Sequence, residues 1–446
     1  MANRGTLSKV RSRGLSVALL SIMLAACGGT VAPASSPSVS PSAAAKPSSA
    51  APAASAKPSA AASAPSISAA PSTAGSAAAK PVASGPAVSA SAKPSAAPSA
   101  ACPSAPATAG AQPSAAAAAA LAPTVKIDIP GVSLNPGAGR SAGLSSTIAP
   151  GGLTTDFIRY DAASHLMYLA DGANLGVDVF DTSAKKLLER IPLPAAPHDM
   201  IVDDSLHLML AALSSMKIAV VDLTTGKESD IDVGGTSIAD LMGYDPASKT
   251  LAVGSKRMTQ LSFLHVDPAG TKVVKKLPLG KDNPEEPVFY NGKFYLSICN
   301  QIAVVDPSSM TITSRQDVPG CEGHGFAMGP GPEAYLGCTK GGAIVNLDTG
   351  KVVASFNASQ VGDTDQPAYD ATKKRYYAPG HVTRNGVDVA VLGVIDATTH
   401  QLLSTRDIDP GSETQGAVDG SGTFYITTGP AVKGACLSAC LFGYQP

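Results

Sequence analysis

The chain has no tryptophan, and aromatic residues make up only 4% of its 446 residues. Sites that bind sugars often stack them on aromatic rings, so this composition argues against carbohydrate binding. Charged residues are also scarce, at 15%, and the formal net charge is -1. Nucleic-acid binding usually needs a basic stripe, and the sequence has none, so we expect no nucleic-acid partner.

Several motifs of enzymes and metal sites are also missing. The sequence contains no HExxH motif, no complete phosphate-binding loop, no CxxCH motif and no CxxC pair. Residues 224–227 (TTGK) and 348–351 (DTGK) resemble pieces of a phosphate loop. Both occupy the same repeat position between two apolar segments, where glycine favours a hairpin turn. We therefore expect a protein that is not an enzyme, although catalysis stays open.

The N-terminus has one apolar run, residues 14–26, which is too short to span a bilayer as a permanent helix. Arg4, Lys9, Arg11 and Arg13 precede it, and residues 24–29 read LAACGG. This arrangement resembles the lipobox of bacterial lipoproteins, which implies a signal peptide over residues 1–26 and lipidation of Cys27. The expected location is the cell envelope, outside the cytoplasm, with the lipid in the membrane. The alternative is an ordinary secretory signal with a chance cysteine.

Residues 27–123 are predicted to be the lipidated cysteine and a disordered linker. From Thr30 to Ala122 the chain is nearly all Ala, Ser and Pro. Such a segment lacks the large apolar side chains whose burial would offset the entropy of ordering, and its prolines interrupt helices. The segment is either a spacer that needs its length or a simple tether.

Seven related units follow, each a turn followed by an apolar or alternating strand. Their opening positions are 39 to 49 residues apart: Asp161, Asp203, Asp245, Tyr290, Gly329, Asp370 and Asp419. A period of about 40 to 50 residues built from short strands is typical of propeller blades. A second half-motif, such as residues 219–235, follows only six of the seven openings.

The missing half-motif occurs upstream of the first unit, where residues 125–131 read VKIDIPG. A ring that takes its last outer strand from the N-terminus leaves no strand edge exposed. We therefore predict an all-β, seven-bladed β-propeller over residues 124–446, closed by this N-terminal strand. We expect it to be a monomer.

Segments of the repeat resemble a known family. Residues 168–171 (YLAD), 179–182 (VFDT) and 189–193 (ERIPL) resemble the YVTN-type repeat of bacterial surface-layer and periplasmic propellers. The resemblance covers most of residues 156–428 and implies the fold. It does not imply one function, because members of that family bind diverse partners.

Polar residues recur five positions before the opening of most units. Six of the seven equivalent positions carry an acid or an imidazole: Asp156, His198, Asp240, Glu285, His324 and Asp365. The starts of the innermost strands surround one mouth of a propeller channel, so these side chains should form a ring. Such a ring can hold a divalent cation or position an attacking water. The alternative is a hydrated channel mouth whose acids cap loop N–H groups. The longest loops on this face are expected near residues 380–385 and 429–441.

The cysteines favour an exported protein in an oxidising compartment. Cys321 precedes the inner strand of unit five and Cys338 ends the neighbouring strand, so we predict a disulfide between them. Cys436 and Cys440 are expected to form a second, local bridge. Cys299 is left over, either free and buried or competing for Cys321.

Three functions follow from these observations. The first is a lipid-anchored binding module for a protein or small-molecule ligand at the loop-rich face. The second is a metal-dependent hydrolase or lactonase with its site at the channel mouth. The third is a structural role in a surface layer, with no site.

Overall fold

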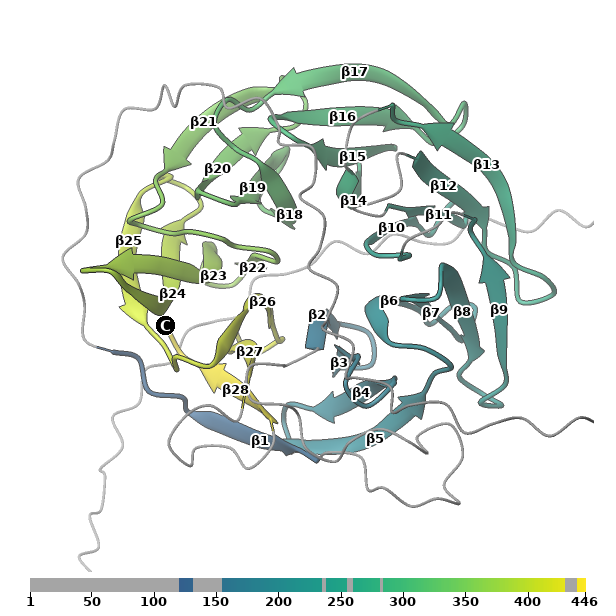
Figure 1. Cartoon of the computed structure of the whole chain (residues 1–446), viewed down its shortest axis with the longest axis horizontal. Helices are drawn as coiled ribbons and strands as arrows, with labels where there is room; N and C mark the ends of the chain where they lie inside the picture. Colours follow the sequence, from purple (N-terminus) through teal and green to yellow (C-terminus); the bar gives the residue numbers. More distant parts are fainter. Residues whose placement is uncertain (1–119, 131–154, 235–237, 255–259, 281–283, 430–438) are drawn as a thin grey trace, which may run out of the picture. The chain divides into compact units, whose positions relative to one another are not determined.

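The computed structural model describes residues 120–130, 155–234, 238–254, 260–280, 284–429 and 439–446. These residues form seven four-stranded antiparallel sheets arranged as blades around a central axis (Figure 1). The predicted all-β, seven-bladed fold is confirmed. Within the described residues there is no helix, and hence none with the length and hydropathy to cross a membrane. The predicted signal peptide and lipidated Cys27 lie outside these residues, as does the linker up to residue 119.

The first four blades run in chain order from the channel outward. Blade 1 is β2 (Thr155–Asp161), β3 (Leu166–Asp171), β4 (Gly176–Asp181) and β5 (Lys186–Pro192). Blade 2 is β6 (Pro197–Asp203), β7 (Leu208–Leu213), β8 (Lys217–Asp222) and β9 (Glu228–Asp232). Blade 3 is β10 (Met242–Asp245), β11 (Thr250–Val253), β12 (Gln260–His265) and β13 (Lys272–Pro278). Blade 4 is β14 (Pro284–Tyr290), β15 (Lys293–Ile298), β16 (Gln301–Asp306) and β17 (Thr311–Asp317).

The last three blades follow the same plan, except that the final one borrows a strand. Blade 5 is β18 (Gly323–Met328), β19 (Glu333–Cys338), β20 (Gly341–Asn346) and β21 (Lys351–Phe356). Blade 6 is β22 (Ala368–Asp370), β23 (Arg375–Arg384), β24 (Val387–Asp396) and β25 (Leu402–Asp407). Blade 7 is β26 (Ser412–Val418), β27 (Phe424–Thr428), β28 (Ala439–Tyr444) and β1 (Val125–Ile129).

The turn after each innermost strand explains the repeated aspartates. In blade 1 the Asp161 carboxylate accepts hydrogen bonds from the N–H groups of Ala163 and Ser164, at 3.1 and 2.9 Å. Such an Asx turn holds the hairpin closed. His165 then takes a left-handed backbone with φ of 59°, and His207 does the same in blade 2 with φ of 53°. Both histidines are exposed, as suits side chains in a solvated hairpin turn.

The burial of each strand depends on its place in the blade. All six residues of β7 are buried, because the blades on either side cover both faces of this strand. The outer strand β13 alternates instead between half-buried and exposed residues. The apolar clusters lie between neighbouring blades: Leu210 and Ile218 of blade 2, for example, share one with Leu251 and Leu264 of blade 3. Blade-to-blade packing is therefore what stabilises the ring.

The N-terminal strand closes this ring, as predicted. β1 pairs antiparallel with β28, from Val125 opposite Gly443 to Ile129 opposite Ala439 (Figure 1). Val125, Ile127 and Ile129 are buried against residues of blades 7 and 1, while the residues between them face solvent. Burying each of these side chains contributes about 1.5–3 kcal/mol to the stability of the fold, so this strand contributes substantially to closing the ring.

The loop expected near residues 380–385 is instead part of a long hairpin. β23 and β24 each run for ten residues, and their pairing continues to Arg384 opposite Val387. Asn385 and Gly386 form the turn, both with positive φ, at 52° and 77°. Asn-Gly is the sequence that favours a two-residue hairpin turn, and this signal explains why the expectation of a long loop was wrong. Of the other expected loop, residues 430–438 lie outside the described residues, while β28 already begins at Ala439.

Candidate functional site

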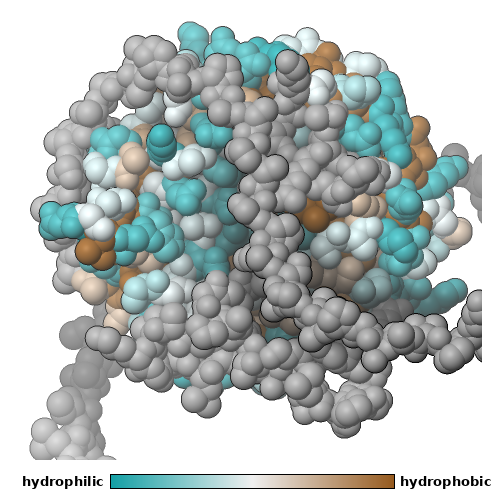
Figure 2. All heavy atoms as spheres, in the orientation of Figure 1, coloured by the Kyte–Doolittle hydropathy of each residue, from teal (hydrophilic) through white to brown (hydrophobic). Residues whose placement is uncertain are grey.

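The predicted polar ring lies at the starts of the inner strands. Asp156 is in β2, His198 in β6, Glu285 in β14 and His324 in β18, whereas Asp240 and Asp365 precede β10 and β22. All inner strands run in the same direction along the channel, so their first residues gather at one mouth. The seventh position carries Thr414, in β26. On the part of the propeller that Figure 2 shows uncovered, polar and apolar side chains are mixed, and the brown apolar ones are separate spots.

Three ring residues from adjacent blades converge on one point. His198 Nδ1 lies 2.8 Å from Asp156 Oδ2 and 3.8 Å from Asp240 Oδ1. One ligand atom from each of Asp156, His198 and Asp240 lies within 4.8 Å of the others. The Asp240 side chain is 9% exposed, while those of Asp156 and His198 are 26% and 23% exposed. The group is therefore held by the protein on one side and open to the channel on the other.

Burial and the charges of neighbouring carboxylates shift the pKa values of Asp156 and His198. Burial raises the pKa of Asp156 to about 7, the hydrogen bond from His198 opposes this rise, and the charges of Asp240 and Asp365 add to it. Burial alone would lower the pKa of His198, but its hydrogen bond to Asp156 and the nearby carboxylates raise it. Carboxylates that repel one another around an imidazole favour a bound cation, because the cation removes the repulsion.

The opposite side of the ring forms a second polar group. His324 Nδ1 lies 3.0 Å from Asp365 Oδ1, and His324 Nε2 lies 2.8 Å from Thr339 Oγ1. Asp365 Oδ2 accepts hydrogen bonds from Thr414 Oγ1 at 3.2 Å and from Gln415 Nε2 at 3.0 Å. These contacts are those of a hydrogen-bonded channel lining. Glu285, the remaining predicted residue, is buried and does not belong to the three-residue group.

Sequence reasoning missed a second polar layer, one step further along the channel. Arg159 of β2 donates to both carboxylate oxygens of Asp199 in blade 2, each at 2.7 Å. Its Nη2 also donates to the Met242 carbonyl of blade 3 at 3.4 Å and to Glu286 Oε1 of blade 4 at 3.1 Å. One arginine therefore joins four consecutive blades. The signal in the sequence was a set of charged residues inside otherwise apolar inner strands.

This layer satisfies its buried charges with backbone groups as well. Asp199 Oδ2 accepts a hydrogen bond from the Met242 N–H at 2.9 Å, and Glu286 Oε2 accepts one from the Phe326 N–H at 2.9 Å. Burial raises the pKa of Glu286 to about 7, although Arg159 opposes this. The layer lies directly beneath the ring and fixes the strands that carry Asp156, His198 and Glu285. It thereby acts as the support that positions the ring residues.

The chemistry of the three-residue group suits a divalent cation. Two carboxylates and one imidazole supply oxygen and nitrogen ligands, a set that binds Mn²⁺, Zn²⁺ and related ions. The exposed side leaves room for water or a ligand to complete the coordination. The residues thus fit either a bound cation or a water held for reaction, the two uses expected of this ring.

The cysteines were partly predicted. Cys321 and Cys338 form the predicted disulfide, with a Cα–Cα distance of 5.1 Å. Cys321 is three residues before His324 of the ring. Cys299 is also disulfide-bonded, so the expectation of a leftover or competing thiol is wrong. Cys440 is disulfide-bonded too, while Cys436, its predicted partner, lies outside the described residues together with Cys102.

The structure establishes the propeller, and the finer family assignment depends on the repeat residues alone. The resemblance to the YVTN-type repeat and to lipoproteins therefore remains a prediction from the sequence. No family model and no curated protein matches this chain.

Proposed function

We propose that this protein is a binding module whose channel mouth holds a divalent cation, and that the cation takes part in binding a protein or small-molecule ligand. The observation that carries the proposal is the convergence of Asp156, His198 and Asp240, whose ligand atoms lie within 4.8 Å of one another. The three residues come from three neighbouring blades, so the site requires blades 1, 2 and 3 to pack against one another.

The surroundings of the group support a bound cation over a purely structural contact. Two carboxylates, those of Asp156 and Asp240, lie on either side of the one imidazole of His198 and can share a cation with it. The group is also open toward the channel, which leaves coordination positions for a ligand. Loops of all blades end at this face, and binding residues on propellers usually occupy such loops.

The N-terminus supports a display outside the cytoplasm. We propose that Cys27 carries the lipid and that residues 27–123 tether the propeller to the membrane. The Cys321–Cys338 disulfide supports this location, because such bonds persist in oxidising compartments.

The proposal is tested by calorimetry and thermal unfolding of the full chain with Mn²⁺, Zn²⁺ and Ca²⁺ added separately. At least one ion should bind, and at a hundredfold excess over its Kd it should stabilise the fold by about 2.7 kcal/mol. Asp156→Asn and Asp240→Asn should abolish this gain, whereas Asp388→Asn, on an exposed hairpin, should preserve it. The proposal is wrong if none of the three ions binds or if the Asn variants bind as well as the parent.

A second candidate is a metal-dependent hydrolase or lactonase. The specific observation in its favour is the 2.8 Å contact between Asp156 and His198 beside Asp240, which is a suitable arrangement for activating a metal-bound water. Hydrolysis of a simple γ-lactone by the metal-loaded chain would support it. His198→Gln should then abolish turnover. A chain that binds metal but leaves lactones and phenyl esters intact would restrict the function to binding.

A further inference from the structure

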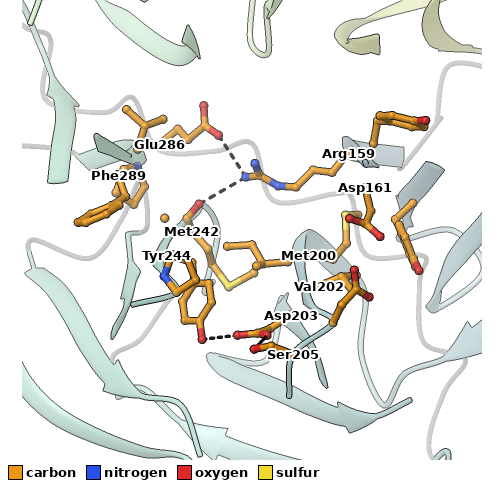
Figure 3. Close-up of a pocket in the computed structure, with 18 residues that line it drawn as sticks. Arg159, Asp161, Met200, Val202, Asp203, Ser205, Met242, Tyr244, Glu286 and Phe289 are labelled. Atoms are coloured by element: carbon orange, nitrogen blue, oxygen red, sulfur yellow. Dashed lines mark hydrogen bonds and ion pairs between the residues drawn. The ribbon is translucent and has the colours of Figure 1, made fainter. Parts of the chain in front are cut away.

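The inner strands of blades 1 to 4 enclose a separate cavity at their opposite ends. Its volume is about 540 Å³, and its wall includes Arg159, Asp203, Tyr244 and Phe289 (Figure 3). Asp156 and Asp161 are five residues apart on one strand, which places the two ends of β2 roughly 16 Å apart. The Arg159 layer lies between them, so this cavity is distinct from the ring at the other mouth. Cavities of this size hold small organic molecules.

Aromatic and apolar side chains form much of the wall. Tyr160, Tyr168, Tyr244 and Phe289 come from three different blades and line the same space. Tyr160, Tyr244 and Phe289 are only partly buried, so part of each side chain remains accessible. Met200 and Met242 also line the wall and are almost completely buried behind it. This wall suits a ligand with a flat apolar body.

The charges on the wall are predominantly negative. Asp161, Asp203 and Asp204 line the cavity, and Arg159 is the one basic side chain among the described residues that do so. Arg159 is already paired with two carboxylates, Asp199 and Glu286, and has no positive charge to spare. An anionic ligand would therefore meet net repulsion here, whereas a cationic one would be attracted.

The acidic groups are held in place for this role. Asp203 Oδ2 accepts a hydrogen bond from Tyr244 Oη at 2.7 Å, and Asp203 Oδ1 accepts one from the Leu206 N–H at 3.1 Å. Burial alone would raise the pKa of Asp203, but the hydrogen bonds from Ser205, Tyr244 and the Leu206 N–H lower it and favour the ionised form. Burial and the charge of Asp161 raise the pKa of Asp204. Two carboxylates from neighbouring blades thus repel each other at the edge of the cavity.

We propose that this cavity binds a small organic cation, an ammonium group carried on a flat apolar body. The ammonium would lie between Asp161, Asp203 and Asp204, and the apolar body would pack on Tyr244 and Phe289. Aromatic faces also attract cations directly, which adds to the attraction of the carboxylates. A bare metal ion fits this space poorly, because the cavity is large and much of its wall is apolar. A neutral ligand of the same shape would lack the electrostatic attraction between the ammonium group and the carboxylates.

The test uses the full chain with 2-phenylethylammonium as probe and 2-phenylethanol as its neutral counterpart, measured by calorimetry or ligand-observed NMR. The cation should bind at least tenfold more tightly than the alcohol. Asp204→Asn should weaken cation binding threefold or more, and Tyr244→Leu should weaken both compounds. Asp230→Asn, which removes the same charge from the outer strand of the same blade, should have no effect.

A further variant separates this cavity from the ring. Asp240→Asn, which should abolish cation stabilisation at the ring, should leave 2-phenylethylammonium binding unchanged, so the two proposals can fail independently. Equal binding of amine and alcohol, or no binding of either, would overturn the cavity proposal. It is also overturned if Asp204→Asn behaves like Asp230→Asn, or if Asp240→Asn abolishes amine binding.

Discussion

Arg159 and Asp199 face each other across the boundary between blades 1 and 2 with two hydrogen bonds of 2.7 Å. The Asp199 side chain is fully buried, and that of Arg159 is 29% exposed. Because the same guanidinium also reaches Glu286, its removal would leave two buried carboxylates without a cation.

Replacing this arginine should therefore destabilise the ring strongly. We expect Arg159→Met to lower the free energy of unfolding by about 3 kcal/mol or more, as for other buried pairs that lose one partner. Arg159→Lys should recover part of the loss, because it restores charge without the two parallel hydrogen bonds. Urea unfolding measures both, and Arg315→Met on the outer strand β17 is the control. A loss at Arg159 no larger than at Arg315 would contradict this role.

The closing strand should be essential to the propeller. Deleting residues 124–131 removes β1 and exposes the edge of β28, so the melting temperature should fall sharply or the protein should aggregate. Deleting residues 60–67 from the predicted linker removes the same number of residues and should have no effect. A chain that melts unchanged without β1 would show that closure does not depend on it.

The disulfide beside the ring should stabilise the fold mainly through the unfolded chain. Its cysteines are 17 residues apart, and closing a loop of that size contributes about 3 kcal/mol in the chain-entropy model. The double variant Cys321→Ser and Cys338→Ser should lose this amount in urea unfolding. Peptide mapping of the exported parent should recover the two cysteines in one cross-linked peptide. Recovery of Cys321 joined to Cys299 would contradict the structure.

Lipid attachment should require Cys27. In cells that process lipoproteins, the parent chain should partition into the detergent phase, whereas Cys27→Ser should move to the aqueous phase. Cys102→Ser, a change at another cysteine before the propeller, should partition like the parent. If all three proteins behave alike, Cys27 is not the anchor.

The stability of the propeller should fall as pH rises toward neutrality, in part because of Glu413. Burial raises the pKa of Glu413 to about 7 from an ordinary value of 4.5, His381 opposes this rise, and Asp365 adds to it. Between these two pH values the folded state binds more protons than the unfolded state, so raising the pH favours unfolding. After allowance for solvent screening, the effect should be on the order of 1 kcal/mol.

Glu413→Gln should remove this contribution. The variant should be more stable than the parent at pH 8 and should lose less stability between pH 4.5 and 7. Glu322→Gln, at an exposed position, is the matched control. Identical pH dependence in parent and Glu413→Gln would show that this side chain titrates normally in the folded protein.

The repeat made the blades and the ring predictable, because equivalent positions of a repeat occupy equivalent places in space. Asp156, His198 and Asp240 are each five residues before a turn aspartate, and this offset alone placed them at one mouth. The N-terminal strand was predictable from the one half-motif missing downstream.

The Arg159 layer and the second cavity follow this rule only in part, and neither was predicted. Arg159 contacts Asp199 and Glu286, which are each four residues before the opening of their unit, and also Met242, which is three residues before its own. Tyr244 and Phe289 in the cavity wall are each one residue before the opening of their unit, whereas Tyr168 comes from the second strand of its blade. A periodic pattern gives the direction of each strand, but the length and orientation of a long side chain decide which blades it joins. Which blades a long side chain contacts can be seen only in the structure.

The position of β1 gives the ring a mechanical property. Val125 is the first strand residue after the predicted tether, and the N–H groups of Leu121 and Thr124 already bond to the carbonyls of Asp407 and Gly443, each at 2.8 Å. Any force transmitted along the chain from Cys27 therefore acts first on these two hydrogen bonds and then on the strand that closes the circle. Tension that detaches this strand would open the propeller at the junction of blades 7 and 1.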